Sequence, residues 1–288
     1  MLENIKIVTS CYGERFHKLL PAWSLSLRRI TEAPISILSL DGLQTLVDVP
    51  GVSVIPCPTQ EPLEWGSGDL VRLEHVVSNL KNNVTCIQID LDVYLKTAID
   101  KIIELDYDFI ISRAFNFPAQ IAKIQGFVLC TGFYIAKPTA LSWCQGLYDE
   151  IRQLACLQSG TPVLDQKVVN VLLKDVEWKS VEHVDEHWRT KLSVCDFMGT
   201  RICVLGAQDI ARNGDLTSSH FGIHHSWVTK LFRHPFLART HRRARLASNM
   251  RKMGGIFTRM VPFQWNESRR RATQARRNPL GRRGRPAT

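Results

Sequence analysis

The sequence has no long hydrophobic run, no closely paired cysteines and no leader-like start. No segment approaches the roughly 18 consecutive apolar residues that a membrane-spanning helix needs. Residues 1–8 contain neither the basic region nor the apolar stretch of a signal peptide. The eight cysteines are scattered, without a CxxC pair or a zinc-like spacing. We therefore expect mostly buried, reduced cysteines and a cytoplasmic protein.

The net charge of +10 is the sum of two unlike parts. Residues 228–288 contain 17 Lys and Arg and one acid, Glu267, which gives +16. The first 227 residues contain 20 basic and 26 acidic residues, which gives −6. The high isoelectric point therefore describes the C-terminal segment, and it is a weak argument that the body of the protein binds nucleic acid.

Strand-like and helix-like patterns alternate along the first part of the chain. The patterns predict strands at 5–8, 35–40, 52–55, 84–89, 109–112 and 126–136, and helices at 16–27, 70–80, 98–105, 138–154 and 164–173. Such alternation predicts an α/β fold with an open, mostly parallel sheet that is flanked by helices. Residues 176–215 show no clear pattern.

Three regions are expected along the chain. They are a catalytic domain at 1–227, a basic amphipathic helical extension at 228–265, and a disordered Arg-rich tail at 266–288.

Two carboxylates, Asp90 and Asp92, directly follow the predicted strand 84–89. In open α/β sheets, ligands bind beyond the carboxyl ends of the strands. The other Asp-x-Asp triplet, Asp106 to Asp108, precedes its strand and is therefore less well placed. Carboxylate oxygens suit Mn²⁺ or Mg²⁺. Such a cation neutralises the negative charge that develops on a diphosphate when it leaves a substrate such as a sugar nucleotide. The alternative is that both aspartates cap the next helix or lie solvated in a loop.

Four blocks of the sequence, at 7–12, 88–92, 130–138 and 164–170, together resemble the nucleotide-diphospho-sugar transferases of the GT-A fold, which is Rossmann-like. The resemblance covers about residues 4–227. It implies a glycosyltransferase of the hexosyltransferase kind, which moves a sugar from a nucleotide-diphosphate donor to an acceptor hydroxyl. UDP- or GDP-linked sugars are the implied donors, and the acceptor is a glycan, a lipid-linked sugar or a protein. The implied cofactor is Mn²⁺ or Mg²⁺.

The resemblance also assigns residues to the donor and the metal. It implies that Thr9, Tyr12 and Asp41 hold the nucleoside. Asp92 is expected to bind the metal directly, and Asp90 to contact the ribose or to bind the metal through water.

A histidine from the block 218–227 is expected to complete the metal site, and His220 is the candidate. His225 stands where relatives place a lysine that meets the diphosphate. The alternative for this His-rich turn is a surface loop or a packing site.

The acceptor side rests on Asp165 and Gln166, which begin a predicted helix. The resemblance implies that this pair faces the sugar and the acceptor, and it favours retention of the anomeric configuration slightly. Asp165 is alternatively a helix N-cap, or the general base of an inverting enzyme. Gly132 allows close approach of the donor sugar, or relieves strand packing. Arg72 is expected to balance phosphate charge, or to be an ordinary surface cation.

The C-terminal segment combines dense Arg and Lys with apolar residues such as Trp227, Leu231 and Phe232. This pattern favours binding to the anionic inner face of a membrane. The alternative is a packed C-terminal helix that is followed by a solvated, charged tail. Nucleic acid is not the expected partner, because the arginine run lacks interleaved aromatic residues. A catalytically silent GT-A-like scaffold is the remaining alternative, against which the presence of Asp92 and His220 argues.

Overall fold

The computed structural model describes residues 4–17, 20–42, 47–57, 67–115, 117–157, 165–212 and 219–224. All of these residues belong to one compact unit, which spans Met1–Leu246. The expected basic extension at 228–265 and the tail at 266–288 lie outside the described residues.

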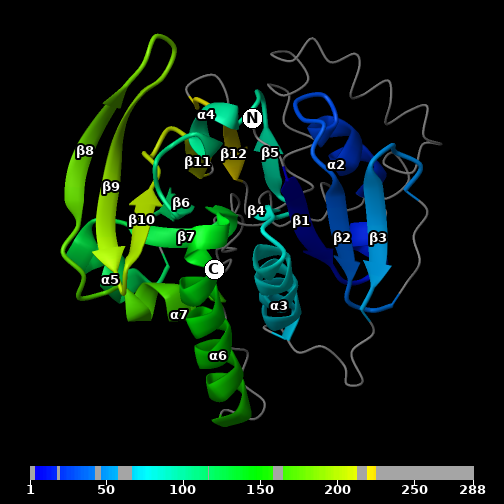
Figure 1. Ribbon diagram of the computed structural model, residues 1–288, viewed down its shortest axis with the longest axis horizontal. Helices are drawn as coiled ribbons and strands as arrows, with labels where there is room; N and C mark the ends of the chain where they lie inside the picture. Colours follow the sequence, from blue (N-terminus) through cyan, green and yellow to red (C-terminus); the bar gives the residue numbers. More distant parts are fainter. Residues whose placement is uncertain are drawn as a thin grey trace, which may run out of the picture. The chain divides into compact units, whose positions relative to one another are not determined.

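A nine-stranded sheet forms the centre of this unit, with the strand order β3-β2-β1-β4-β7-β6-β10-β9-β8 (Figure 1). Its strands are β1 (Ile5–Cys11), β2 (Ile35–Ser39), β3 (Val52–Pro56), β4 (Thr85–Ile89), β6 (Phe109–Ala114), β7 (Val128–Ala136), β8 (Lys179–Val184), β9 (Arg189–Phe197) and β10 (Thr200–Val204).

The half of the sheet that contains β3, β2, β1 and β4 is parallel throughout. Strand β7 then runs antiparallel to both of its neighbours, β4 and β6. Beyond β6, β10 is parallel to β6 and antiparallel to β9, which forms a hairpin with β8. The parallel half brings the carboxyl ends of β1, β2 and β4 to one edge, where ligands bind in such sheets.

The helices are α1 (Glu14–His17), α2 (Leu20–Leu27), α3 (Ser67–Lys81), α4 (Asp100–Ile103), α5 (Ala119–Gln125), α6 (Leu141–Leu157) and α7 (Asp165–Leu172), and a short 3₁₀ turn, Pro138–Ala140, precedes α6. Apolar residues of α3, α6 and α7 pack together against β1, β4, β6 and β7 in one buried cluster. Because these three helices bury apolar stripes on the same core, the N-termini of α3 and α7 are fixed relative to the sheet.

A second, three-stranded sheet has the order β11-β12-β5. It consists of β5 (Val93–Leu95), β11 (Ile210–Arg212) and β12 (Gly222–His224). Strand β5 starts just after the end of β4, and β12 pairs with it in the antiparallel direction. This pairing therefore places β12, although it is distant in the sequence, next to the carboxyl end of β4.

The predicted α/β architecture with a central sheet flanked by helices is confirmed, although the sheet is mixed beyond β4. The antiparallel position of β7 was not visible from the sequence, because a strand buried on both faces has the same apolar pattern in either direction. Between residues 176 and 212 the structure has β8 to β11, which the sequence did not resolve. Within the described residues, no helix combines the length and the apolar character needed to cross a membrane.

Candidate metal and donor site

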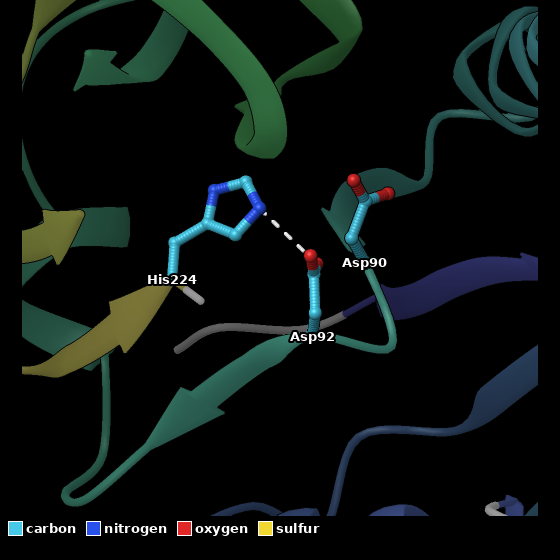
Figure 2. Close-up of side chains that lie close together, drawn as sticks. All are labelled: Asp90, Asp92 and His224. Atoms are coloured by element: carbon cyan, nitrogen blue, oxygen red, sulfur yellow. Dashed lines mark ion pairs between the residues drawn. The ribbon is translucent and has the colours of Figure 1, made fainter. Parts of the chain in front are cut away.

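Asp90, Asp92 and His224 converge at the carboxyl end of β4 (Figure 2). One ligand atom from each of the three side chains lies within 4.8 Å of the others. His224 Nε2 lies 3.1 Å from Asp92 Oδ1. Two carboxylates and an imidazole are a donor set that binds Mn²⁺ well, and the residues present therefore fit a divalent metal.

Strand pairing explains why these three residues meet. The Asp90 amide donates to the Gly132 carbonyl of β7 at 2.8 Å, and the Asp90 carbonyl accepts from the Val93 amide at 3.0 Å, which closes a tight turn before β5. In the pairing of β5 with β12, His224 stands opposite Val93, the residue that follows Asp92. The register of the small sheet thus places His224 beside the second carboxylate.

A buried arginine, Arg72 of α3, lies next to the metal candidates and binds three carboxylates. Its guanidinium donates to Asp90 at 2.8 Å, to Asp69 at 2.9 Å and to Asp165 at 2.8 Å. Arg72 is only 6% exposed, so the alternative that it is an ordinary surface cation is wrong. The structure places it among carboxylates, where its charge holds Asp90 and Asp165 together.

The pKa shifts in this cluster arise from burial first and from repulsion between the carboxylates second. Burial is the main reason that the pKa of Asp90 is raised, and Asp92 raises it further against the opposing effect of Arg72. Burial, followed by the charge of Asp165, raises the pKa of Asp69 to about 7. Burial alone lowers the pKa of His224, but Cys130 and Asp92 raise it well above its usual value. A divalent cation relieves this kind of repulsion between carboxylates.

Asp165 and Gln166 lie at the N-terminus of α7, on the other side of Arg72. One Asp165 oxygen accepts from Arg72, and the other accepts from the Thr131 hydroxyl at 2.8 Å and from the Gln166 amide. The Gln166 side-chain amide donates to the Phe117 carbonyl at 2.8 Å. Asp165 therefore joins β7, α3 and α7, and the bond from the Gln166 amide comes from the next residue, whereas an N-cap side chain accepts from an amide two or three residues later.

The expected nucleoside residues lie along the neighbouring strands of the same edge. Asp41, which follows β2, accepts from the Gly13 amide at 2.7 Å and lies 2.8 Å from His17 Nε2. Tyr12, just before Gly13, is 49% exposed. Thr9 is fully buried on β1, and its hydroxyl has no hydrogen-bond partner within the part of the chain that is described.

Gly132 lies against the imidazole of His224. A Cβ atom on Gly132 would come within 2.2 Å of His224 Cε1. The small residue at this position therefore makes room for the histidine ring, a relationship that the sequence did not indicate.

His220, the histidine expected at the metal, contacts Asp209 instead. Its Nδ1 lies 2.7 Å from Asp209 Oδ1. Asp209 is fully buried and also accepts from Trp188 at 2.8 Å and Thr190 at 2.9 Å. The structure thus brings His224, and not His220, to Asp90 and Asp92. His225 lies outside the described residues.

Sequence reasoning missed His224, Asp69 and Cys130 as parts of the site. His224 belongs to the His-rich block 218–227, but only the pairing of β12 with β5 distinguishes it from His220. Asp69 carries a weak signal, because it stands three residues before Arg72 on the predicted helix, a spacing at which side chains meet. No sequence pattern singles out Cys130.

Similar proteins support the fold. The galactosyltransferase LgtC, crystallised in complex with donor and acceptor sugar analogues, superimposes with a TM-score of 0.53 at 12% sequence identity, over 91% of this chain and 99% of that one. An active-site variant of LgtC, with a glutamine replaced by glutamate, gives a TM-score of 0.54 over the same shares. No protein-family model and no curated protein matches the sequence. The chain thus has the GT-A-like fold seen in these glycosyltransferases.

Proposed function

We propose that the protein is a metal-dependent glycosyltransferase, which transfers a sugar from a nucleotide-diphosphate donor to an acceptor hydroxyl. The observation that carries the proposal is the meeting of Asp90, Asp92 and His224 at the carboxyl end of β4, in a GT-A-like fold. The other Asp-x-Asp triplet has no comparable setting, because Asp106 is bound to Arg201 at 2.8 Å and its side chain is 90% exposed.

Asp90, Asp92 and His224 would hold Mn²⁺ or Mg²⁺, with Mn²⁺ favoured by the imidazole nitrogen. When bound, the ion neutralises the negative charge that develops on the departing diphosphate. In the transfer, the bond between the anomeric carbon and the phosphate oxygen breaks, a bond from that carbon to the acceptor oxygen forms, and the acceptor hydroxyl gives its proton to the departing diphosphate oxygen.

The residues of this chain bind and orient the donor. Arg72 fixes the carboxylates of Asp90 and Asp165 through hydrogen bonds of 2.8 Å each. Tyr12, a residue that is 49% exposed next to the Gly13 amide bound by Asp41, offers a surface for the nucleobase. Gln166 and Asp165 face the sugar in this proposal, and Gly132 leaves the space that His224 needs.

The surroundings of Asp165 favour a retaining reaction over an inverting one. An inverting enzyme needs a carboxylate that is positioned to take the acceptor proton. Both Asp165 oxygens already accept hydrogen bonds from Arg72 and Thr131, at 2.8 Å each. This arrangement suits a positioning role for Asp165 and supports the retaining reaction in this proposal.

The proposed donor is a UDP- or GDP-linked sugar, and the proposed acceptor is a glycan, a lipid-linked sugar or a protein. LgtC, whose crystals contained donor and acceptor sugar analogues, supports a sugar acceptor in general terms. We also propose a cytoplasmic location, with the basic segment 228–288 bound to the inner face of an anionic membrane.

The test is release of nucleoside diphosphate from a panel of UDP- and GDP-linked hexoses, measured with Mn²⁺, with Mg²⁺ and with EDTA. The wild type should release diphosphate from at least one donor with metal and none with EDTA. Asp92→Asn should lower the rate at least about 100-fold, because an oriented charge at a reacting group is worth several kcal/mol. Asp106→Asn, in the second triplet, is the matched control and should keep the wild-type rate. A silent scaffold would release nothing from any donor.

A further inference from the structure

Cys130 of β7 lies against the histidine of the metal site. Its Sγ is 3.3 Å from His224 Nδ1, and both residues are buried, Cys130 completely. The other ring nitrogen, Nε2, faces Asp92 at 3.1 Å. The imidazole is therefore placed between a thiol on one nitrogen and the carboxylates on the other.

Two residues of β7 fix the place of the ring. The register of β7 against β6 shifts next to Cys130, and in this irregular stretch both Cys130 and Gly132 lie against the His224 imidazole. The His224 ring occupies the space above Gly132, where a Cβ would lie 2.8 Å from Nδ1 and 2.2 Å from Cε1. Cys130 and Gly132 together form a slot that accepts the imidazole in one orientation.

We propose that Cys130 is a positioning residue, which fixes the tautomer and the orientation of His224 for metal binding. The proposal rests on the proposed function, because it takes Asp90, Asp92 and His224 as the metal ligands. An imidazole that binds metal through Nε2 is neutral and carries its proton on Nδ1. That N–H then donates to the Cys130 sulfur, and Nε2 is directed toward the two carboxylates.

A sulfur atom is an unusual partner for this role. Histidines that bind metals generally donate their second N–H to a carboxylate, a backbone carbonyl or water, and loss of that partner typically costs 10- to 100-fold in metal affinity. Sulfur is a weaker acceptor than oxygen. Serine at position 130 should therefore keep the hydrogen bond, whereas alanine should remove it.

The experiment is titration of the full-length protein with Mn²⁺, followed by electron paramagnetic resonance, with pulsed measurements of the coupling between Mn²⁺ and a directly bound ¹⁴N nucleus. Wild type should show the ¹⁴N coupling, and His224→Ala should lose it. Cys130→Ala should weaken Mn²⁺ binding by about 10- to 100-fold and reduce or change the coupling. Cys130→Ser should recover most of the affinity and the wild-type coupling.

Cys144→Ala is the matched control, because Cys144 is an equally buried thiol on α6. It should bind Mn²⁺ as the wild type does, and melting temperatures report folding for each variant. If Cys130→Ala does not fold, Cys130→Val, which keeps the bulk and lacks a hydrogen-bond acceptor, takes its place.

The two levels of the proposal can fail separately. Wild-type affinity and coupling in Cys130→Ala or Cys130→Val, with the ¹⁴N signal lost in His224→Ala, would overturn the role of Cys130 alone. Absence of Mn²⁺ binding to the wild type would overturn both the role of Cys130 and the metal-dependent function.

Discussion

The backbone of Gly132 lies so close to the imidazole of His224 that a single added Cβ would approach Cε1 to 2.2 Å. The same glycine accepts a hydrogen bond from the Asp90 amide at 2.8 Å. One residue of β7 therefore contacts two of the three residues at the candidate metal site, and its small size leaves room for one of them, His224.

Replacement of Gly132 by alanine should displace His224 and weaken Mn²⁺ binding at least about 10-fold. Loss of the hydrogen-bond partner that orients a metal-binding histidine lowers metal affinity by this amount, and we expect a similar loss when the histidine itself is displaced. Overpacking should also lower the free energy of unfolding by about 1–3 kcal/mol. Mn²⁺ titration and denaturant unfolding measure the two effects. The control is Gly146→Ala, on the exposed surface of α6, where a Cβ meets nothing within 4 Å. Wild-type Mn²⁺ affinity in Gly132→Ala would contradict the geometry.

The partly buried carboxyl of Asp69 should make the stability of the metal-free protein depend on pH. Its pKa is about 7 in the folded protein, against an ordinary value of 3.8. The folded state therefore binds this proton more tightly than the unfolded chain does, so the stability that Asp69 contributes should fall as the pH rises from about 4 to about 7 and stay constant above that. Because Asp90 and His224 also have raised pKa values, Asp69→Asn should reduce the slope of the profile between pH 4 and pH 7 without removing it, and should be more stable than the wild type at pH 8.

Melting temperatures in EDTA at a series of pH values measure this dependence. Asp149→Asn, on α6, is the control, because its carboxylate is exposed and accepts a surface hydrogen bond from Gln145. It should reproduce the wild-type profile. A profile for Asp69→Asn that parallels the wild type would show that another group carries the pH dependence.

Asp41 should act on donor binding through the loop that carries Tyr12. Asp41→Ala removes the acceptor for the Gly13 amide and the contact with His17, which should cost about 1–3 kcal/mol of stability. Affinity for UDP or GDP should fall both with metal and in EDTA, because the loop is separate from the metal ligands. Asp48→Ala, at an exposed position before β3, is the control. Equal nucleotide affinity in the two variants would remove Asp41 from the donor site.

The basic segment should bind anionic membranes without taking part in transfer. Deletion of residues 229–288 should lower binding to vesicles that contain anionic lipid far more than it lowers donor hydrolysis. Each basic residue near such a surface contributes about 1 kcal/mol, and salt screens this attraction within a Debye length. Vesicle co-sedimentation at low and high salt measures the effect. Equal binding by the full-length and shortened proteins would refute the membrane role.

The sequence predicted most of the parallel half of the fold, because strands buried by helices on both faces appear as apolar runs that end at Asp, Gly or Pro. It also identified Asp90 and Asp92, since both follow such a run. The rest of the site depends on long-range pairing. Only the register of β12 against β5 distinguishes His224 from His220, and only the tertiary placement of α7, which packs on α6 and β7, brings Asp165 to Arg72. Local sequence patterns contain no information about which residues from distant segments come together.

The measurement that tests the central claim most directly is calorimetric titration of UDP- and GDP-linked sugars into the wild type, Asp92→Asn, His224→Ala and His220→Ala, each with Mn²⁺, Mg²⁺ or EDTA. Metal and donor should strengthen each other's binding in the wild type, with Mn²⁺ more effective than Mg²⁺. Asp92→Asn and His224→Ala should lose this coupling while remaining folded, and His220→Ala should keep it. Donor affinity that is the same in EDTA, in Asp92→Asn and in the wild type with Mn²⁺ would contradict the account.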